Sequence, residues 1–390
     1  MIEYSKILSE TAVKIPPSGI RKFFDIAAGM KDVISLSIGE PDFKTPYIAR
    51  KEGIKSLERG TTWYTANAGM SELRDEIAAY MRRRFKVDYS PVDEIMVTVG
   101  GSEGIDVCIR SIVEPGDEVL LPEPCFVCYA PVVQLCGGIA VRIPLKAEDH
   151  FVLTPGDLKA AITEKTKLLI LPFPNNPTGA SMSRQQYQAI AEVLKDTDIL
   201  VLSDEIYAEL TYGDEPGSSF ASISGMKERT VVINGFSKAY AMTGWRLGFV
   251  CAPKDILAVM LKIHQFAIMS APSTAQYAAI AALKHCSADV EAMRQEYDSR
   301  RRLVVDSLNK MGLHCFNPTG AFYVFPDIRS TGFSAEEFCT RLLKEKRVAV
   351  VPGTAFGAQG EGFVRISYCY SLEHIIKALE KIREFIGEIK

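Results

Sequence analysis

The sequence has no uninterrupted apolar stretch approaching the roughly 18 residues of a membrane span. It also has no basic block or stripe: 45 Lys and Arg stand against 48 Asp and Glu, for a formal charge of −3. We therefore expect neither a membrane nor nucleic acid as a partner. The first residues lack the basic-then-apolar order of a signal peptide, which predicts a cytoplasmic protein.

Cysteine and histidine are present, but not in the spacings that build disulfide frameworks or metal sites. The nine cysteines are odd in number and scattered, which is not the pattern of a disulfide scaffold. Cys125 and Cys128 form a C-x-x-C, yet a zinc site would need a second pair or close histidines. We interpret this pair as helix packing and predict no metal. His264 lies in a helix-like stretch and is also expected to pack rather than to act in catalysis.

The chain of 390 residues is long for a single hydrophobic core, which predicts two lobes. Between about residues 90 and 250, short β-branched runs alternate with amphipathic stretches such as 105–113 and 184–194. This alternation predicts an α/β fold with a mostly parallel sheet and helices on both faces. The expected strands are 95–99, 118–121, 139–143, 167–171, 199–202, 230–233 and 246–251.

The last hundred residues have a different pattern, with a helix expected at 288–311 and strands at 321–325, 348–351 and 363–367. This predicts a smaller α+β domain, which a strand at 33–38 could complete. The expected domains are an N-terminal arm with part of the small domain (1–45), a large domain (46–285) and a small C-terminal domain (286–390).

Two loops that follow expected strands carry groups suited to ligand binding. Residues 100–104 read GGSEG and open a helix, so backbone N–H groups and the helix dipole could hold a phosphate. Residues 172–179 read PFPNNPTG, a stiff loop that could present the amide of Asn176. Taken singly, each is equally or better explained as a structural turn.

Two further loops follow the strands expected at 199–202 and 230–233. The first carries Asp204 and Tyr207, and the second carries Ser237 and Lys238, with Arg246 soon after. Alone, Asp204 is more simply a helix cap and Lys238 a solvent-facing lysine.

Together these groups fall at the carboxyl edge of one sheet, where ligands of such folds bind. Chemistry with pyridoxal phosphate (PLP) needs this set. A lysine amine forms an imine with the cofactor aldehyde, and a carboxylate keeps the pyridine nitrogen protonated. A phenol and an amide tune the imine through the ring hydroxyl, and an arginine holds the phosphate with the helix N-terminus.

The chain resembles, essentially end to end, the class I/II aminotransferases of the fold-type-I PLP-dependent enzymes. The order and spacing of the matching segments agree with that family. These segments are SLSIGEPD (35–42), YTANAG (64–69), NPTG (176–179), SDEIY (203–207), SK (237–238), GWRLG (244–248) and VRIS (364–367).

The resemblance implies a role for individual positions of this chain. Lys238 would carry PLP as a Schiff base and shuttle a proton between the substrate Cα and cofactor C4′. Asp204 would pair with the pyridinium nitrogen, and Tyr207 and Asn176 would bond the ring hydroxyl. The phosphate would be held by Gly101, Ser102, Glu103 (through its backbone), Ser237 and Arg246.

Further positions follow from the same resemblance. Phe126 would stack on the pyridine ring. Arg365 would grip the substrate carboxylate, with help from the Gly39 and Asn176 region. Tyr64 would reach the phosphate of a neighbouring subunit, which implies a homodimer with shared active sites.

One position departs from the pattern: Gly235 stands where many members of the family have a serine that touches the phosphate. The sequence NGFSK occurs in a bacterial branch similar to aromatic, aspartate and N-acetyl-diaminopimelate aminotransferases. The resemblance thus implies a ping-pong reaction through pyridoxamine phosphate, with an aromatic or acidic L-amino acid as donor and 2-oxoglutarate as acceptor.

Alternatives remain open on the same scaffold. A PLP-dependent C–S β-lyase or a decarboxylase would use nearly the same residues, although Arg365 favours substrates that keep their carboxylate. A regulator fused to a DNA-binding domain is not expected, because the pattern begins by about Ser18. Tyr323 and Ile20 fit either the substrate pocket or the core.

Overall fold

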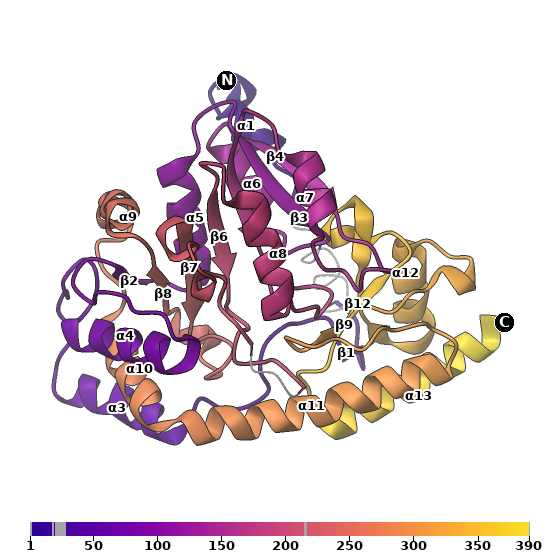
Figure 1. Ribbon diagram of the computed structural model, residues 1–390. Coiled ribbons are helices and arrows are strands. Elements are labelled where there is room, and N and C mark those ends of the chain that lie inside the picture. The colour runs from indigo at the N-terminus through magenta and orange to yellow at the C-terminus, as the bar shows by residue number, and fades with distance from the viewer. Residues whose placement is uncertain (1, 18, 20–28, 214–216, 390) are drawn as a thin grey trace.

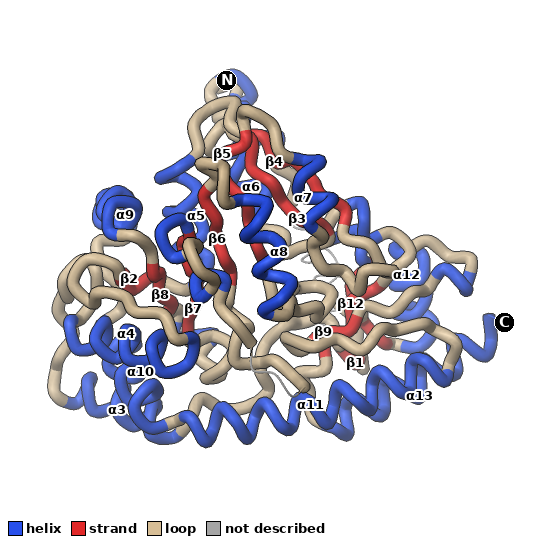
Figure 2. The backbone as a smooth tube through the Cα atoms, viewed as in Figure 1, coloured by secondary structure: helices blue, strands red, loops and turns tan. Residues whose placement is uncertain are grey.

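A computed structural model describes the chain except for residues 1, 18, 20–28, 214–216 and 390. A seven-stranded sheet runs through its middle with helices on either side (Figures 1 and 2). Its strands are β2 (Ile95–Thr98), β3 (Glu118–Glu123), β4 (Ile139–Pro144), β5 (Thr166–Leu171), β6 (Leu200–Asp204), β7 (Thr230–Gly235) and β8 (Gly248–Cys251).

The spatial order of the large sheet is β2-β8-β7-β6-β5-β3-β4. Strands β3 to β7 pair in parallel, and only β8 runs antiparallel to its neighbours β2 and β7. The mostly parallel sheet predicted from the alternating pattern is thus confirmed. Because parallel strands end at one edge, the loops after β5, β6 and β7 are brought together there.

Strand alternation divides the core into layers. In β5, Leu168 and Ile170 belong to one apolar cluster, whereas Leu169 and Leu171 belong to another on the opposite face. The first cluster includes α5 (Gly101–Ile112), α6 (Tyr129–Leu135) and α9 (Lys254–Ala267). The second includes α7 (Pro155–Ala161) and α8 (Arg184–Leu194). Helices therefore cover both faces, as predicted.

The remaining helices lie beyond these layers. Helices α3 (Tyr47–Glu58), α4 (Ser71–Phe85) and α10 (Ser273–His285) pack together, and their buried residues share a cluster with β2, β7 and β8. The short α1 (Glu10–Lys14) lies at the N-terminal end of the chain (Figure 1). No helix in the described ranges is long and apolar enough to cross a bilayer.

Two smaller sheets are built from both ends of the chain. Strands β9 (Tyr323–Val324), β12 (Val364–Ser367) and β11 (Val351–Pro352) form an antiparallel sheet, and β1 (Ile34–Ser35) pairs in parallel with β10 (Val348–Ala349). These small sheets pack against α11 (Ser287–Lys310), α12 (Ala335–Lys346) and α13 (Leu372–Ile389). The smaller α+β part is confirmed, including its N-terminal strand. The exact domain limits stay a prediction.

The start of α5 matters for the site. The amphipathic stretch at 105–113 marks only the later, buried turns of this helix, and we expected residues 100–104 to open it. In the structure α5 begins at Gly101 and ends at Ile112. The helix N-terminus therefore lies directly after β2, where the sequence predicted it.

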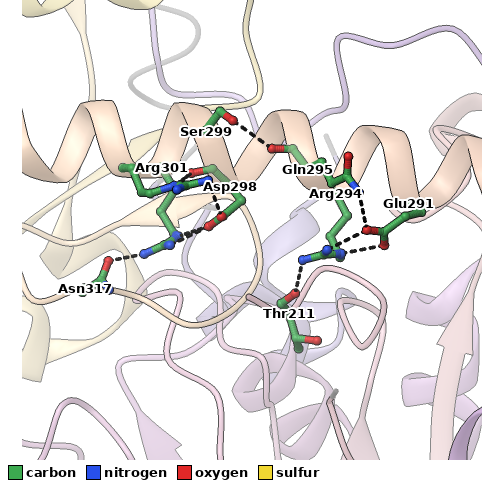
Figure 3. A network of polar contacts seen from close by, with 9 residues as sticks. Thr211, Glu291, Arg294, Gln295, Asp298, Ser299, Arg301 and Asn317 are labelled. Atoms are coloured by element: carbon green, nitrogen blue, oxygen red, sulfur yellow. Dashed lines mark hydrogen bonds and ion pairs between the residues drawn. The ribbon is translucent and has the colours of Figure 1, made fainter. Parts of the chain in front are cut away.

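Helix α11 is fixed by a polar network (Figure 3). Arg301 bonds Asp298 of its own helix and Asn317 in the loop that precedes β9, and its guanidinium lies 5.2 Å from the ring centroid of Tyr212. Two turns away, Arg294 donates to the backbone carbonyl of Thr211 at 3.3 Å. The network thus joins α11 to the loops that lead into β9 and out of β6.

We expect Arg301→Met to lower the free energy of unfolding by about 1–3 kcal/mol, because it leaves polar partners of a buried guanidinium unsatisfied. Arg302→Met is the matched control. Arg302 also pairs with Asp298, at 2.9 Å, but its side chain is 67% exposed, so a loss below about 1 kcal/mol is expected. Urea unfolding followed by circular dichroism measures both. Equal losses in the two variants would contradict a structural role for the network.

Candidate functional site

A cavity of about 470 Å³ lies at the carboxyl edge of the large sheet, and residues of the small sheet also line it. The site residues expected from the sequence all line this cavity, except Glu103 and Tyr64. Residues from β9 and β12 complete its wall with Tyr323 and Arg365. The topology therefore gathers side chains that lie more than 300 positions apart in the sequence.

Lys238 follows β7 and lies partly buried on the wall of the cavity. Its Nζ donates to the carbonyl of Gly39 at 2.7 Å and lies 5.8 Å from the ring centroid of Tyr207. Burial lowers the pKa of Lys238 to about 8; the positive charges of Arg365 and Arg246 act in the same direction, against Cys369 and Glu40. A sizeable fraction of this amine is thus unprotonated near neutral pH, which makes it a nucleophile.

Asp204 is the last residue of β6, so its side chain is delivered directly to the cavity. Its Oδ2 accepts from the hydroxyl of Tyr129 at 2.7 Å, and its Oδ1 accepts from the N–H of Ile206 at 3.2 Å. Burial raises the pKa of Asp204, while these two hydrogen bonds lower it. The carboxyl is thus buried but hydrogen-bonded, and it caps no regular helix.

Arg365 lies inside β12 and is 2% exposed. Its Nη1 donates to Oδ1 of Asn176 at 2.8 Å, and its Nη2 donates to the carbonyl of Ser37. Its Nε is buried and has no hydrogen-bond partner among the described residues. A buried guanidinium on the wall of a cavity suits a carboxylate ligand.

An anion cradle lies where β2 passes into α5. Gly100 has a φ of +78°, and a Cβ placed there would lie 2.7 Å from Nη2 of Arg246. Only glycine combines that conformation with so close an approach of the guanidinium. The N-terminus of α5 and Arg246 thus meet at one point of the cavity, which also has Ser102 and Ser237 on its wall. These donors fit a phosphate group.

The packing at Gly235 explains the departure noted in the sequence. A Cβ at this position would lie 2.8 Å from the Cα of Gly248 on the neighbouring strand β8. Strands β7 and β8 approach so closely that a side chain here would require a backbone shift. The predicted loss of one phosphate contact at Gly235, which has no side-chain hydroxyl, stays a prediction.

Two expected residues do not face the cavity with their side chains. Glu103 lies in the first turn of α5, but its Oε1 contacts Nδ1 of His264 at 2.6 Å. His264 is fully buried, and its Nε2 lies 2.9 Å from the carbonyl oxygen of Asn67. The histidine thus links the phosphate cradle to the loop that carries Tyr64. Tyr64 itself is 77% exposed.

The structure also adds residues that the sequence did not indicate. Tyr129 bonds Asp204, and nothing in the spacing around it pointed to that contact. Tyr323, which fitted either pocket or core, lines the cavity, whereas Ile20 lies outside the described residues. Cys125 and Cys128 pack at the start of α6, and no three His, Cys, Asp or Glu of the described chain are placed to hold a metal ion.

Comparisons with known proteins agree with this geometry. A family model described as "Aminotransferase class I and II" matches residues 31–382. The YugH protein of Bacillus subtilis is 54% identical over 97% of this chain and 98% of its own length. An aspartate aminotransferase of Pyrococcus abyssi is 45% identical over 98% of this chain and 99% of its own.

A solved structure extends the likeness to the fold. The aromatic aminotransferase of Pyrococcus horikoshii OT3 superposes with a TM-score of 0.90 at 44% identity, over 95% of this chain and 99% of that one. Members of this family are PLP-dependent. The chain therefore belongs to the class I and II aminotransferases, and it is a PLP-dependent aminotransferase of the aspartate and aromatic type with the fold-type-I architecture.

Proposed function

We propose that Lys238 binds PLP and that the enzyme moves the amino group of an L-amino acid to a 2-oxo acid, 2-oxoglutarate, by a ping-pong route. The observation that carries the proposal is the amine of Lys238, with its pKa lowered to about 8, on the wall of the same cavity as the guanidinium of Arg365. The amine can form an imine with an aldehyde cofactor, and the guanidinium can bind a carboxylate.

The cavity offers a partner for each part of PLP. The N-terminus of α5 at 101–103, Ser237 and Arg246 would hold the phosphate. Asp204 would pair with the pyridine nitrogen, and Phe126 would cover the ring face. When bound, PLP supplies an electron sink for the bond that is broken at the donor Cα.

Asn176 can serve both cofactor and substrate. Its Oδ1 already accepts from Arg365, which orients the amide and leaves its NH₂ group to donate to the cofactor ring oxygen beside Tyr207. Arg365 is held in turn by Asn176 and Ser37, so its free Nε is preorganised for the donor carboxylate.

Lys238 would also act as the proton carrier at the donor Cα. Once its amine is released from the cofactor, the carbonyl of Gly39 is within reach to orient it, as it does at 2.7 Å here. An amine with a pKa of about 8 both accepts and returns a proton near neutral pH.

The lining of the cavity favours aromatic over acidic donors. Among its described residues the cations are Lys238, Arg246 and Arg365, and each has a task in the proposal. Ile38 and Phe126 add apolar surface. The second carboxylate of an acidic donor would therefore lack a described cation of this subunit, whereas an aromatic ring would find apolar contacts.

A homodimer is proposed from exposed apolar residues near the site. Trp63 and Tyr64 lie in the loop after α3, and Phe266, Ile268 and Met269 lie in the last turn of α9 and just after it. The bond from Asn67 Nδ2 to the carbonyl of Met269, at 2.7 Å, joins the two segments. Exposed large apolar side chains gathered in this way mark interaction surfaces. We propose that this surface faces a second copy of the chain, with Tyr64 reaching the partner's phosphate. A cytoplasmic location stays a prediction.

The lowered pKa of Lys238 predicts the pH dependence of cofactor uptake. The rate at which apoenzyme takes up PLP should rise with pH and level off above about 8, because the amine loses its proton there. N-acetyl-lysine in solution is the control, and its rate should keep rising towards its ordinary pKa of about 10.4. Stopped-flow absorbance measures both. The same pH profile for protein and model amine would contradict a desolvated Lys238.

For donor choice, we expect tyrosine or phenylalanine to convert the holoenzyme about tenfold faster or more than aspartate, since a second carboxylate enters an apolar lining unpaired. Loss of the visible cofactor band after each donor, and its return on adding 2-oxoglutarate, measures the two half-reactions. A faster reaction with aspartate would contradict the apolar pocket. Pyruvate release without loss of the band would instead indicate a β-lyase.

Phe266 is 88% exposed, and we expect Phe266→Asp to weaken dimerisation because it places a charge on the proposed apolar surface. Val92→Asp, at an apolar residue that is 78% exposed outside that surface, is the control. Sedimentation velocity should show monomer for the first variant and dimer for the second. Wild-type protein that sediments as a monomer would refute the dimer.

A further inference from the structure

Two tyrosine hydroxyls meet inside the cavity, one from each sheet. The hydroxyl oxygens of Tyr207 and Tyr323 lie 2.9 Å apart, and their rings are edge-on with centroids 5.9 Å apart. Tyr207 follows β6 of the large sheet, whereas Tyr323 begins β9 of the small one. Both rings are buried. Within the described chain, Tyr323 is the one hydrogen-bond partner of the Tyr207 hydroxyl.

Tyr323 has little freedom to turn elsewhere. The guanidinium carbon of Arg365 lies 4.6 Å from its ring centroid. Behind the hydroxyl, a Cβ built on Gly39 would lie only 1.8 Å from the oxygen, so glycine is required there. The backbone of Tyr323 pairs with Ser367 of β12. Its hydroxyl is thus held against Tyr207 by two segments, β12 and the stretch that carries Gly39.

The charges around the pair favour one direction for the hydrogen bond. Burial raises the pKa of Tyr207 well above its usual value, and the adjacent Tyr323 raises it further. Burial also raises the pKa of Tyr323, but the positive Arg365 opposes it, so the pKa reaches only about 12. Arg365 lowers the pKa of Tyr207 as well, but there it ranks behind both effects of Tyr323. Tyr323 is therefore the more acidic hydroxyl and the better donor. Tyr207 can accept from it and keep its own proton for the cavity.

We propose that Tyr323 is a positioning residue, whose hydroxyl donates to Tyr207 and thereby strengthens the hydrogen bond that Tyr207 gives to the ring oxygen of PLP. This inference rests on the proposed function of Lys238 and Tyr207. A hydroxyl that accepts one hydrogen bond becomes a better donor in the next. The two tyrosines form a relay that reaches from the Arg365 side of the cavity to the cofactor.

The relay has a consequence that can be measured. A strong donor on the ring oxygen draws electron density from it, so that oxygen holds the proton of the neighbouring lysine–cofactor linkage less tightly. The pKa of that linkage is then lower with the relay than without it. Removing the Tyr323 hydroxyl should raise this pKa, because the hydroxyl acts on the ring oxygen through Tyr207.

Tyr323→Phe tests the relay because it removes the hydroxyl and keeps the ring under Arg365. In a pH titration of the visible absorption of holoenzyme, we expect the midpoint to rise by about half a unit. Tyr297→Phe is the matched control. The hydroxyl of Tyr297 is buried without a hydrogen-bond partner in the described chain, and its midpoint should equal that of the wild type.

A double variant shows whether the effect passes through Tyr207. Tyr207→Phe should raise the midpoint by more than Tyr323→Phe, and adding Tyr323→Phe to it should change nothing further. An unchanged midpoint in Tyr323→Phe would overturn the inference, as would an equal shift that persists without Tyr207. If wild-type protein takes up no PLP and stays colourless, the proposed function itself is wrong.

Gly39→Ala gives a second route if Tyr323→Phe fails to fold. Its added Cβ would displace the Tyr323 hydroxyl while leaving both tyrosines in the chain. We expect the midpoint to rise in this variant also, by a similar amount. A folded, coloured Gly39→Ala protein with the wild-type midpoint would overturn the relay.

Discussion

Three ionisable side chains are withdrawn from water at one edge of the large sheet, Asp204 and Arg365 almost fully and Lys238 in part. Much of the surrounding structure is arranged to hold them there. Each costs several kcal/mol to bury unless hydrogen bonds replace its water. Gly39, Tyr129 and Asn176 supply part of that replacement. Some polar groups of the site remain without a partner, above all Nε of Arg365, and a ligand can supply the missing hydrogen bonds.

The same constraint joins the two sheets. The contacts across the cavity pair Arg365 with Asn176, Tyr323 with Tyr207, and Glu40 with Thr243. Each contact serves a buried or half-buried polar group, so a change in the relative position of the sheets would alter several of them at once. The network on α11 supports this arrangement from behind, because it fixes the loop that leads into β9 (Figure 3).

The sequence predicted what depends on local pattern. The seven strands and their mostly parallel order follow from alternation and turn chemistry, and the polar residues after each strand had to converge because parallel strands end together. Asp204 was read as lying just past its strand, and β6 in fact continues through it. The strand continues because Ser203 and Asp204 are buried within the fold although they are polar. Strand propensity, which considers only local sequence, does not predict this.

What could not be predicted depends on contacts between distant segments. Tyr129 bonds Asp204 only because α6 packs against β3 and β4 of the same sheet, and Tyr323 meets Tyr207 only because the small sheet closes the cavity. The turn of Glu103 towards His264 has the same origin. The spacing of residues in the sequence does not reveal these long-range contacts. The roles implied by the family resemblance could be assigned, because they belong to residues within recognisable motifs.

The attachment point of the cofactor is the most direct test of the account. Holoenzyme would be reduced with borohydride, which fixes an imine-bound cofactor to its lysine, then digested and analysed by mass spectrometry. The account predicts that the peptide containing Lys238, and no other, gains the mass of one phosphopyridoxyl group. Modification of a different lysine, or none in protein that has been given PLP, would contradict it.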